Sequence, residues 1–303
     1  MSTRMQSFKE IIKEAARRGR KKFILPGSAS CCMAALSLAV REGLAFPVWI
    51  GDGEEGKKQF ERYGIGTSER EILDEGKPEK VLYTACECLR AGEADILMQG
   101  AVAHRAFLER VLDREKGLGA GKAASFVSVF DPPQIPKLTM ITDSYINNFP
   151  SLEEKIGIVE NAVRLAGILG IASPKIAALS AIEQVNPAIP STLDAAILSK
   201  MSERRQFGAA VIEGPLDIDC AVSEGAALRK GVKSIVTGQA DIYFTPNVES
   251  GYLTAQLNVF IAGTPMAGVL MGTSHPVILD LPWISREDKL AEAALAVLLC
   301  PGK

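Results

Sequence analysis

The stretch SLEEKIGIVENAVRLAGILGIASPKIAALS, residues 151–180, decides the fold class because it predicts one helix followed by one strand. Ser151 and Glu154 form the S-x-x-E capping box that starts a helix. The apolar residues of the expected helix recur at spacings of three or four: Ile156, Val159, Val163, Ala166 and Leu169. Gly170 supplies a helix stop, and residues 175–180 (KIAALS) have the length and apolar character of a buried strand. This stretch is therefore typical of an α/β unit.

The same alternation continues on both sides of that stretch, which indicates an α/β fold with mainly parallel sheets. The expected strands are 21–26, 46–52, 94–100, 126–131, 137–143, 175–180, 208–214 and 240–246, and residues 267–280 return to the first domain. The expected helices are about 6–18, a helix ending at 42, 54–61, 78–91, 103–115, 191–204, 223–230 and 286–299. Several strands end in Gly or Asp, and loops at the carboxyl ends of parallel strands bind ligands in such folds.

Length and composition exclude several classes of protein. The 303 residues suggest two domains, and a net charge of −2 argues against a general nucleic-acid binder. No apolar run reaches the roughly 20 residues of a membrane span, and the N-terminus lacks the apolar core of a secretory signal, so we expect a cytoplasmic protein without a membrane partner. Six cysteines without a CxxC pair and two histidines are poor material for a metal site, so we expect reduced thiols and no metal.

The residues Asn147-Asn148-Phe149-Pro150 interrupt regular structure and mark the expected domain boundary. We expect a first α/β domain of residues 1–143 plus 271–303, and a second of residues 144–270.

Known phosphate-binding and nucleophile motifs do not occur: GxGxxG, GxxxxGK[ST] and GxSxG are absent from the sequence. Polar residues instead follow several apolar strands, among them Gln99, Asp143, Glu183, Asp219 and Asp241. Each one alone is explained as turn chemistry, but together they suggest a ligand cleft.

Three long segments carry a resemblance to a known family: residues 142–196 (TDSYINNFPSLEEKIG…STLDAA), 214–231 (GPLDIDCAVSEGAALRKG) and 237–251 (TGQADIYFTPNVESG). The chain resembles the phosphate acetyltransferase and phosphate butyryltransferase family over roughly residues 10–300, and the butyryl type fits better. The resemblance implies a two-domain, three-layer αβα protein with an interdomain cleft, and a homodimer. It also implies acyl transfer between coenzyme A and orthophosphate, with coenzyme A as a substrate and no bound cofactor.

Acyl transfer of this kind needs a base near the thiol, donors for the tetrahedral oxyanion and a holder for phosphate. By resemblance, the catalytic candidates are Asp288 as base, with Arg286 and Ser285 as phosphate and oxyanion contacts. The substrate-binding candidates implied by the resemblance are Ser125, Asp143, Asp241, Asn247, Gly251 and His104. His104 would act as an acid or base, or as an anion donor, and otherwise it is a polar residue at a helix start.

The segment Asp280-Leu281-Pro282-Trp283-Ile284-Ser285-Arg286-Glu287-Asp288 allows two alignments with the catalytic loop of the family. In one, Pro282-Trp283 replaces the family's Ser-Arg pair and the phosphate donors are lost. In the other, Ser285-Arg286 is that pair, displaced by about four residues. Ser285 is also explained as a plain helix N-cap.

Other departures from the family remove basic and hydroxyl groups in residues 98–104 and 117–126 and at Gln256. They support an alternative interpretation, a catalytically degenerate homologue that binds acyl-CoA or serves as a subunit. A third interpretation, a metal-dependent decarboxylating dehydrogenase, lacks the expected aspartate spacing.

Overall fold

The computed structural model describes residues 3–27, 30–120 and 123–301, and its contacts divide the chain into two compact units. Unit 1 comprises Met1–Ser7 and Ser125–Met266, and unit 2 comprises Phe8–Ala124 and Ala267–Lys303. The chain therefore passes to the other unit at Ser125, earlier than the expected boundary near residue 143. The reason is strand pairing: β6 (Thr139–Thr142) lies parallel to β9 (Ile242–Phe244) and antiparallel to β5 (Ser125–Phe130), so both early strands share a sheet with later ones.

Unit 2 contains a mostly parallel sheet with the strand order β3-β2-β1-β4-β11-β10, in which only β10 and β11 pair antiparallel among the described strands. The strands are β1 (Lys21–Pro26), β2 (Ala45–Gly51), β3 (Glu71–Asp74), β4 (Ile96–Met98), β10 (Met266–Met271) and β11 (Val277–Ile278). The helices are α1 (Phe8–Arg17), α2 (Ser30–Arg41), α3 (Gly53–Arg62), the 3-10 turn η1 (Thr67–Glu69), α4 (Pro78–Arg90), α5 (His104–Val111) and α11 (Arg286–Leu299).

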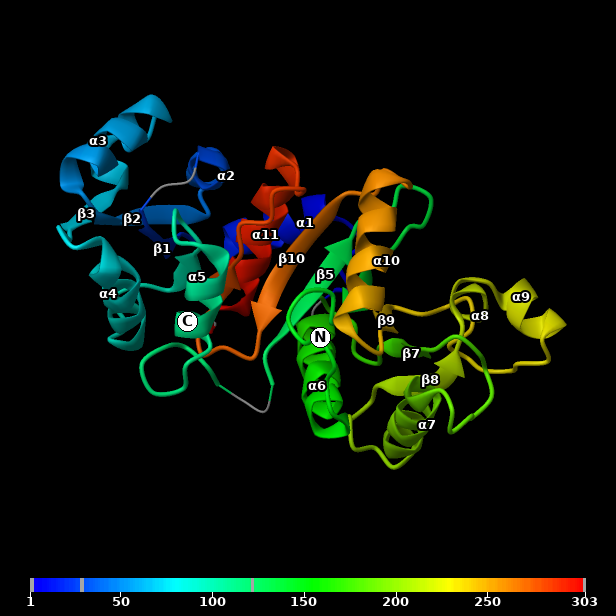
Figure 1. The fold of residues 1–303 in the computed structure, drawn as a ribbon. Coiled ribbons are helices and arrows are strands. Elements are labelled where there is room, and N and C mark those ends of the chain that lie inside the picture. Colours follow the sequence, from blue (N-terminus) through cyan, green and yellow to red (C-terminus); the bar gives the residue numbers. More distant parts are fainter. Residues whose placement is uncertain (1–2, 28–29, 121–122, 302–303) are drawn as a thin grey trace. The chain divides into compact units, whose positions relative to one another are not determined.

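Helices of unit 2 lie on both sides of its sheet, as a three-layer arrangement requires. Figure 1 shows α2 and α3 on one side of β1 and β2, and α4 on the other. α11 packs against α1 and α2, and α4 packs against α5. The expected layers are confirmed in this unit.

Unit 1 contains the strand order β5-β6-β9-β7-β8, in which β6, β9, β7 and β8 are parallel. Its other strands are β7 (Lys175–Leu179) and β8 (Val211–Leu216). Its helices are α6 (Leu152–Ile168), α7 (Pro190–Glu203), α8 (Ile218–Val222), α9 (Glu224–Arg229) and α10 (Val248–Phe260). The expected α/β class with mainly parallel sheets is confirmed.

Helix α6 begins at the predicted capping box, because the Ser151 hydroxyl accepts the Glu154 N–H while the Glu154 carboxylate accepts the Ser151 N–H. Its buried face is turned slightly from the expected one. Val159, Ala166 and Leu169 are buried as predicted, but Ile156 and Val163 are only partly buried. Ile158, Ala162 and Leu165 occupy the core instead.

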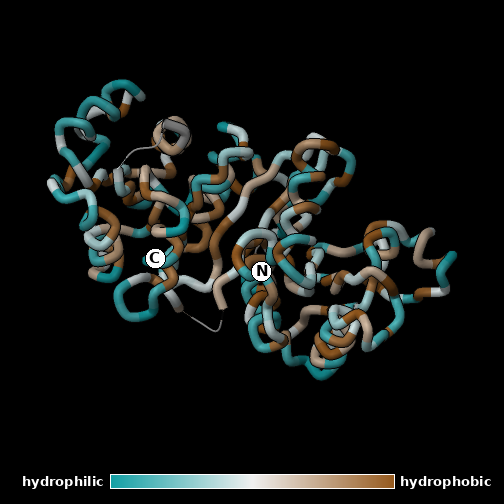
Figure 2. Tube along the Cα trace, in the orientation of Figure 1, coloured by the Kyte–Doolittle hydropathy of each residue, from teal (hydrophilic) through white to brown (hydrophobic). Residues whose placement is uncertain are grey.

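Apolar residues gather on the strands, and polar residues on the outer helices. Figure 2 shows α3 largely in the hydrophilic colour, in keeping with its sequence GEEGKKQFER. All six residues of β5 are buried, as are all six of β10. Among the described residues, no helix is both long enough and apolar enough to cross a membrane.

Candidate active site

In unit 2, the loops that follow the neighbouring parallel strands β4 and β11 meet at the side chain of Gln99. The pairing of Ile278 with Met98 sets Gln99 beside the residues that follow β11. The Asp280 N–H donates to Gln99 Oε1 at 3.0 Å, and Gln99 Nε2 donates to the Val102 carbonyl at 3.1 Å. Gln99 is 4% exposed. This amide therefore joins the two loops at the carboxyl edge of the sheet, where ligands bind in α/β folds.

His104 begins helix α5 and lies against the same amide. Its Nδ1 is 3.3 Å from Gln99 Oε1, and its ring is partly buried. Burial lowers the pKa of His104 below its usual 6.5, because a charged imidazolium loses hydration there. The neutral imidazole is therefore the main form at neutral pH.

The segment from Asp280 to Asp288 ends in a conventional helix start. The Ser285 hydroxyl accepts the Asp288 N–H at 3.0 Å and is the N-cap of α11. Ser285 and Arg286 are exposed, and Asp288 is partly buried. The N-cap interpretation of Ser285 is thus confirmed, and the serine, arginine and aspartate lie in one helix turn.

A buried ion pair holds this segment to the sheet. Lys289 is 4% exposed, and its ammonium group contacts the partly buried Asp280 carboxylate. One turn further along α11, Glu292 is 1% exposed, and its Oε1 accepts the Gly268 N–H at 3.2 Å. Burial raises the pKa of Glu292 well above its usual value, because the charged carboxylate loses its hydration there.

In unit 1, Asp143 serves as the anchor of the loop that follows β6. The carboxylate accepts the N–H groups of Phe126 and Tyr145 at 3.0 Å, and that of Asn147 at 2.9 Å. Burial raises the pKa of Asp143, and these N–H donors act against that rise. All of these bonds stay within the protein, so the carboxylate orders its own loop.

Asp241, just before β9, joins three separate segments of unit 1. Its carboxylate lies 2.7 Å from the Arg4 guanidinium and 3.3 Å from the Lys137 ammonium, and accepts the Lys175 N–H at 3.0 Å. Asp241 is 3% exposed. It therefore pairs with two cations and ties the N-terminal segment to the sheet.

The remaining candidates of unit 1 also have structural contacts. The Asn247 side chain is the N-cap of α10 and accepts the Ser250 N–H at 3.0 Å. Gly251 lies where a Cβ would be 2.1 Å from the Asp143 carbonyl oxygen, so α10 approaches that loop closely. The buried Ser125 hydroxyl accepts a hydrogen bond from Asn161 Nδ2 at 2.9 Å.

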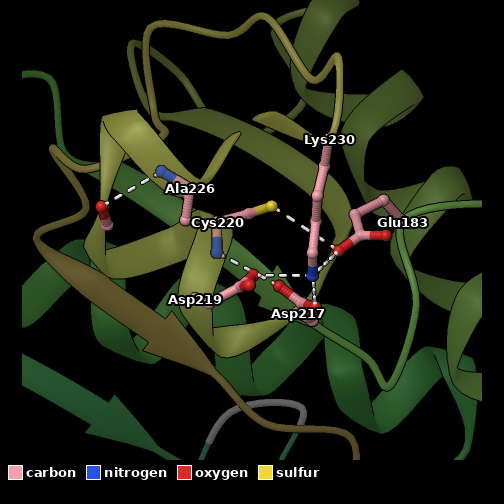
Figure 3. A network of polar contacts seen from close by, with 7 residues as sticks. Glu183, Asp217, Asp219, Cys220, Ala226 and Lys230 are labelled. Carbon is pink, nitrogen blue, oxygen red and sulfur yellow. Dashed lines mark hydrogen bonds and ion pairs between the residues drawn. The ribbon is translucent and has the colours of Figure 1, made fainter. Parts of the chain in front are cut away.

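Figure 3 shows an acidic cluster of unit 1 arranged around the ammonium group of Lys230. Glu183 and Asp219 place carboxylate oxygens 2.7 and 2.8 Å from Lys230 Nζ, and Asp217 also contacts it. The three carboxylates and the Cys220 sulfur are atoms of the kind that bind metal ions. One such atom from each of the four residues lies within 4.8 Å of the others. The Lys230 ammonium places one positive charge among the three carboxylates and so offsets part of their charge.

Buried cysteines of the described residues are poor nucleophiles. Burial raises the pKa of Cys86 and Cys88 to about 11, and that of Cys220 and Cys300 to about 12. Since the thiolate is the reactive form, these four thiols do not serve as catalytic nucleophiles.

A cavity of about 910 Å³ opens at the carboxyl ends of β1, β2 and β3. Its lining includes the acidic residues Asp52, Asp74 and Glu75, together with Trp49 and Gly51. Asp52 and Asp74 accept N–H groups at the start of α3. The volume suits a small-molecule ligand, but the acidic wall disfavours an anion, so we expect orthophosphate to bind elsewhere.

The structure brings some predicted residues together within each unit. Ser285, Arg286 and Asp288 share one helix turn, and Asp143 packs directly against Gly251. Lys289 and Glu292 were not predicted as site residues, because buried charge in a helix gives no sequence signal distinct from surface charge. Gln99 was among the polar residues that the sequence pattern placed after an apolar strand, and its bond to the loop after β11 is what the structure adds.

Comparison with known proteins gives consistent matches over almost the whole chain. A family model described as "Phosphate acetyl/butaryl transferase" matches residues 69–297. The chain is 38% identical to a phosphate butyryltransferase of Clostridium acetobutylicum, over 99% of this chain and 100% of that protein. It is 35% identical to a phosphate acetyltransferase of Thermotoga maritima, over 96% and 99%. The structure resembles a branched-chain phosphotransacylase from Enterococcus faecalis V583, with a TM-score of 0.80 and 25% identity over 93% and 100% of the two chains.

Proposed function

Since the chain belongs to the phosphate acetyl/butaryl transferase family, we propose that it moves a short or branched acyl group between coenzyme A and orthophosphate. The observation that carries the proposal is the match to a phosphate butyryltransferase along both units and all of that protein. The likeness to a branched-chain phosphotransacylase supports the choice of a short or branched acyl group.

The reaction exchanges one acyl bond for another. A phosphate oxygen attacks the thioester carbonyl carbon, the C–S bond breaks, and coenzyme A leaves as the thiolate. In reverse, the thiol loses its proton and attacks the acyl phosphate, and the C–O bond to phosphate breaks. Both directions need a cation for phosphate and a donor for the oxyanion. The reverse direction also needs a proton acceptor at sulfur, and in the first direction the same group can return a proton to the departing thiolate.

The first turn of α11 offers a set of groups for these roles. Arg286 is exposed and carries the planar fork that matches two phosphate oxygens. Ser285 accepts a backbone N–H, and its own O–H remains a donor toward an oxyanion. Asp288 is the carboxylate candidate for the proton acceptor, and His104 is the second candidate. The helix N-terminus also favours a bound anion at this position.

The candidates of unit 1 divide into two groups. Asp143, Asp241, Asn247 and Gly251 are engaged in contacts that fix loops and helix α10, so we propose that they position the substrate loops rather than bind substrate directly. Ser125 keeps the role of a substrate contact. The interdomain cleft and the homodimer expected from the resemblance stay predictions.

A thiol-release assay tests the proposal. The purified protein is given acetyl-, propionyl-, butyryl- or isobutyryl-CoA, each with and without phosphate, and free thiol is measured. We expect phosphate-dependent release, greatest with a four-carbon chain. Arg286→Ala is expected to raise the KM for phosphate at least tenfold, while Arg17→Ala, which removes an exposed arginine paired with Glu14, is expected to leave it unchanged.

Two outcomes would contradict parts of this assignment. Phosphate-dependent release that is equal in Arg286→Ala and the wild type would remove Arg286 from the site. No release with any acyl-CoA, together with coenzyme A binding by calorimetry, would support the degenerate acyl-CoA-binding protein instead.

A further inference from the structure

We propose that Lys289 is a positioning residue, whose buried ion pair with Asp280 fixes the first turn of α11 and thereby sets Arg286 for phosphate. The inference rests on the proposed function for the identity of the anion that Arg286 binds. The fixing of the turn by Lys289 follows from contacts within unit 2 alone. It extends the site from groups that would touch substrate to a buried charge behind them.

The first step is that the backbone of Asp280 is held in place. Its N–H donates to Gln99 Oε1 at 3.0 Å, and Gln99 is 4% exposed. Gln99 Nε2 in turn donates to the Val102 carbonyl at 3.1 Å, in the loop that follows β4. Asp280 is therefore tied to the ends of two neighbouring parallel strands, β4 and β11, before the chain turns toward α11.

The second step is that Lys289 joins α11 to this held point. Its N–H donates to the Ser285 carbonyl at 3.0 Å, so Lys289 belongs to the start of the helix. Its side chain is buried, and its ammonium contacts the Asp280 carboxylate. Both ends of the segment are thus joined, and Arg286, which is exposed, lies between them.

The third step is that this pair supplies direction more than stability. A buried ion pair gives little net stability, because both charges lose hydration, and a methionine at position 289 would avoid that loss. Leu281 and Ile284, at 0% and 6% exposure, already hold the segment against the core. Apolar contacts are non-directional, whereas an ammonium must meet its carboxylate at hydrogen-bond distance. The pair therefore fixes how the first turn of α11 faces.

The direction of this turn matters most for phosphate. An arginine binds phosphate through two parallel N–H···O bonds, and a displacement of about 1 Å is enough to spoil such a geometry. In a loosened turn, Arg286 would attract phosphate by charge alone. Loss of the ion pair is therefore expected to raise the KM for phosphate more than the KM for acyl-CoA.

Steady-state kinetics of Lys289→Met test this expectation. We expect its KM for phosphate to rise about tenfold, and its KM for acyl-CoA to change by less than about twofold. Added to Arg286→Ala, the same substitution should change the KM for phosphate by less than about twofold, because both variants lose the same contact. Lys200→Met, which removes an exposed lysine paired with Glu203 on α7, is the control and should leave both constants unchanged.

A double variant separates positioning from folding. Lys289→Met alone leaves the Asp280 carboxylate without this cation and is expected to lower the thermal midpoint. Adding Asp280→Asn removes the negative charge, so the midpoint is expected to recover. The raised KM for phosphate is expected to persist in the double variant, because the directional contact is still missing. A purely structural role would instead restore the KM together with the midpoint.

Amide hydrogen exchange observes the turn without any turnover. The Asp288 N–H donates to the Ser285 hydroxyl, and the Lys289 N–H to the Ser285 carbonyl, both at 3.0 Å. In the double variant, exchange in residues 281–289 is expected to quicken by about tenfold or more, because the turn opens more often. Exchange in α6, which lies in unit 1, should match the wild type.

The outcomes distinguish this inference from the proposed function. Unchanged exchange at residues 281–289, or a normal KM for phosphate in the double variant, would overturn the positioning by Lys289. Independent effects of Lys289→Met and Arg286→Ala, or no effect of Arg286→Ala, would overturn its action through Arg286. A wild type without turnover, combined with quickened exchange in the double variant, would contradict the proposed function and leave the fixing of the turn intact.

Discussion

Glu292 places a carboxyl group among the buried alanines Ala291, Ala293 and Ala294 of α11, and its Oε2 has no hydrogen-bond partner in the described part of the chain. In the unfolded chain this carboxyl titrates near 4.5, and burial raises its pKa in the folded protein. Above pH 4.5 the unfolded chain therefore loses its proton first. Stability falls by about 1.4 kcal/mol for each pH unit until the folded pKa is reached.

Glu292→Gln is expected to remove that loss, because the neutral amide keeps an acceptor for the Gly268 N–H and cannot ionise. Urea unfolding at pH 5.5, 7.0 and 8.5 measures the effect. The stability of the variant relative to the wild type should increase with pH. Glu14→Gln, on the surface of α1, is the control and should leave the pH dependence unchanged. An equal pH dependence in Glu292→Gln and the wild type would contradict a raised pKa for Glu292.

At the residue scale, the sequence predicted polar chemistry at strand ends but not which groups touch. Gln99 and Asp143 follow apolar strands, so their places at the carboxyl edge were predictable from the pattern. The bond from Asp280 to Gln99 joins positions 181 residues apart, and no local pattern encodes it. The hydroxyl of Ser285 shows the converse, since its capping role follows from the adjacent sequence alone.

At the element scale, the close approach of α10 to the loop after β6 depends on the absence of a side chain at Gly251. A Cβ there would lie 2.1 Å from the Asp143 carbonyl oxygen and 2.7 Å from Thr245 Oγ1. Backbone atoms cannot yield as a flexible side chain can. Gly251→Ala is therefore expected to lower the free energy of unfolding by about 1–3 kcal/mol.

Gly167 provides the matched control for that prediction. It lies near the end of α6, and a Cβ there would meet nothing within 4 Å. Gly167→Ala is expected to stabilise the protein by about 0.4–1 kcal/mol, because alanine favours the helix and restricts the unfolded chain. Urea unfolding of both variants gives the comparison, and equal effects of the two substitutions would refute the close approach.

Lys230 connects three segments, since its ammonium bonds Glu183 in the loop after β7 and Asp217 and Asp219 around the start of α8. The hydrogen bond from Lys230 holds the pKa of Glu183 below its usual value. Such a depressed pKa stabilises the fold above pH 4.5, and the contribution is lost as the pH falls through the folded pKa.

Lys230→Met is therefore expected to lower the thermal midpoint at pH 7, and the difference from the wild type should shrink as the carboxylates become protonated toward pH 4. Differential scanning calorimetry at both pH values checks this. Lys200→Met, which removes an exposed pair with Glu203 on α7, should show a smaller effect. A difference that is the same at both pH values would argue against the charge-based explanation.

The elements that sequence reasoning missed share weak patterns. Strand β3 has the sequence EILD and is half exposed, so it lacks the apolar run of its neighbours. Helix α10 carries apolar residues on opposite faces, Ala255 inward and Leu253 outward, which hides the helical period. The strongly periodic or capped elements α6 and α11, by contrast, begin where the sequence predicts.

At the scale of the whole molecule, the outward face of α10 is the feature that fits an assembly. Leu253, Leu257 and Phe260 recur at spacings of four and three and are 61%, 59% and 65% exposed. With Ile261, which is 79% exposed, they expose roughly 400–500 Å² of apolar side-chain surface, taking about 150–200 Å² for each complete side chain. This is about half of the roughly 800 Å² per partner of a standard interface.

We expect this face to pair with a second copy of the chain. Light scattering after size exclusion should give twice the 32.4 kDa mass for the wild type. Leu257→Glu should give the monomer mass, and Ile197→Glu, at a 42% exposed position on α7, should remain dimeric. A monomeric wild type, or a dimeric Leu257→Glu protein, would contradict this use of α10.

The sequence predicted the parallel sheets of both units but not how the chain is shared between them. The difference lies in β5 and β6, whose sequence pattern resembles that of the earlier strands. β5 pairs with β6, and β6 pairs with β9, about a hundred residues further along; such long-range pairing is decided by packing rather than by local sequence.

The interrupted path of unit 2 has a consequence for synthesis on the ribosome. Unit 1 is almost one continuous stretch, but unit 2 is not. In unit 2, strand β4 pairs with β11, and helices α1 and α2 pack against α11. Both β11 and α11 come after Ala267, far along the chain from their partners. A nascent chain must therefore carry the unpaired edge of β4 and the uncovered faces of α1 and α2 until β11 and α11 have been made. The half of the protein that is made first is completed last, and its unfinished surfaces are what a chaperone would meet.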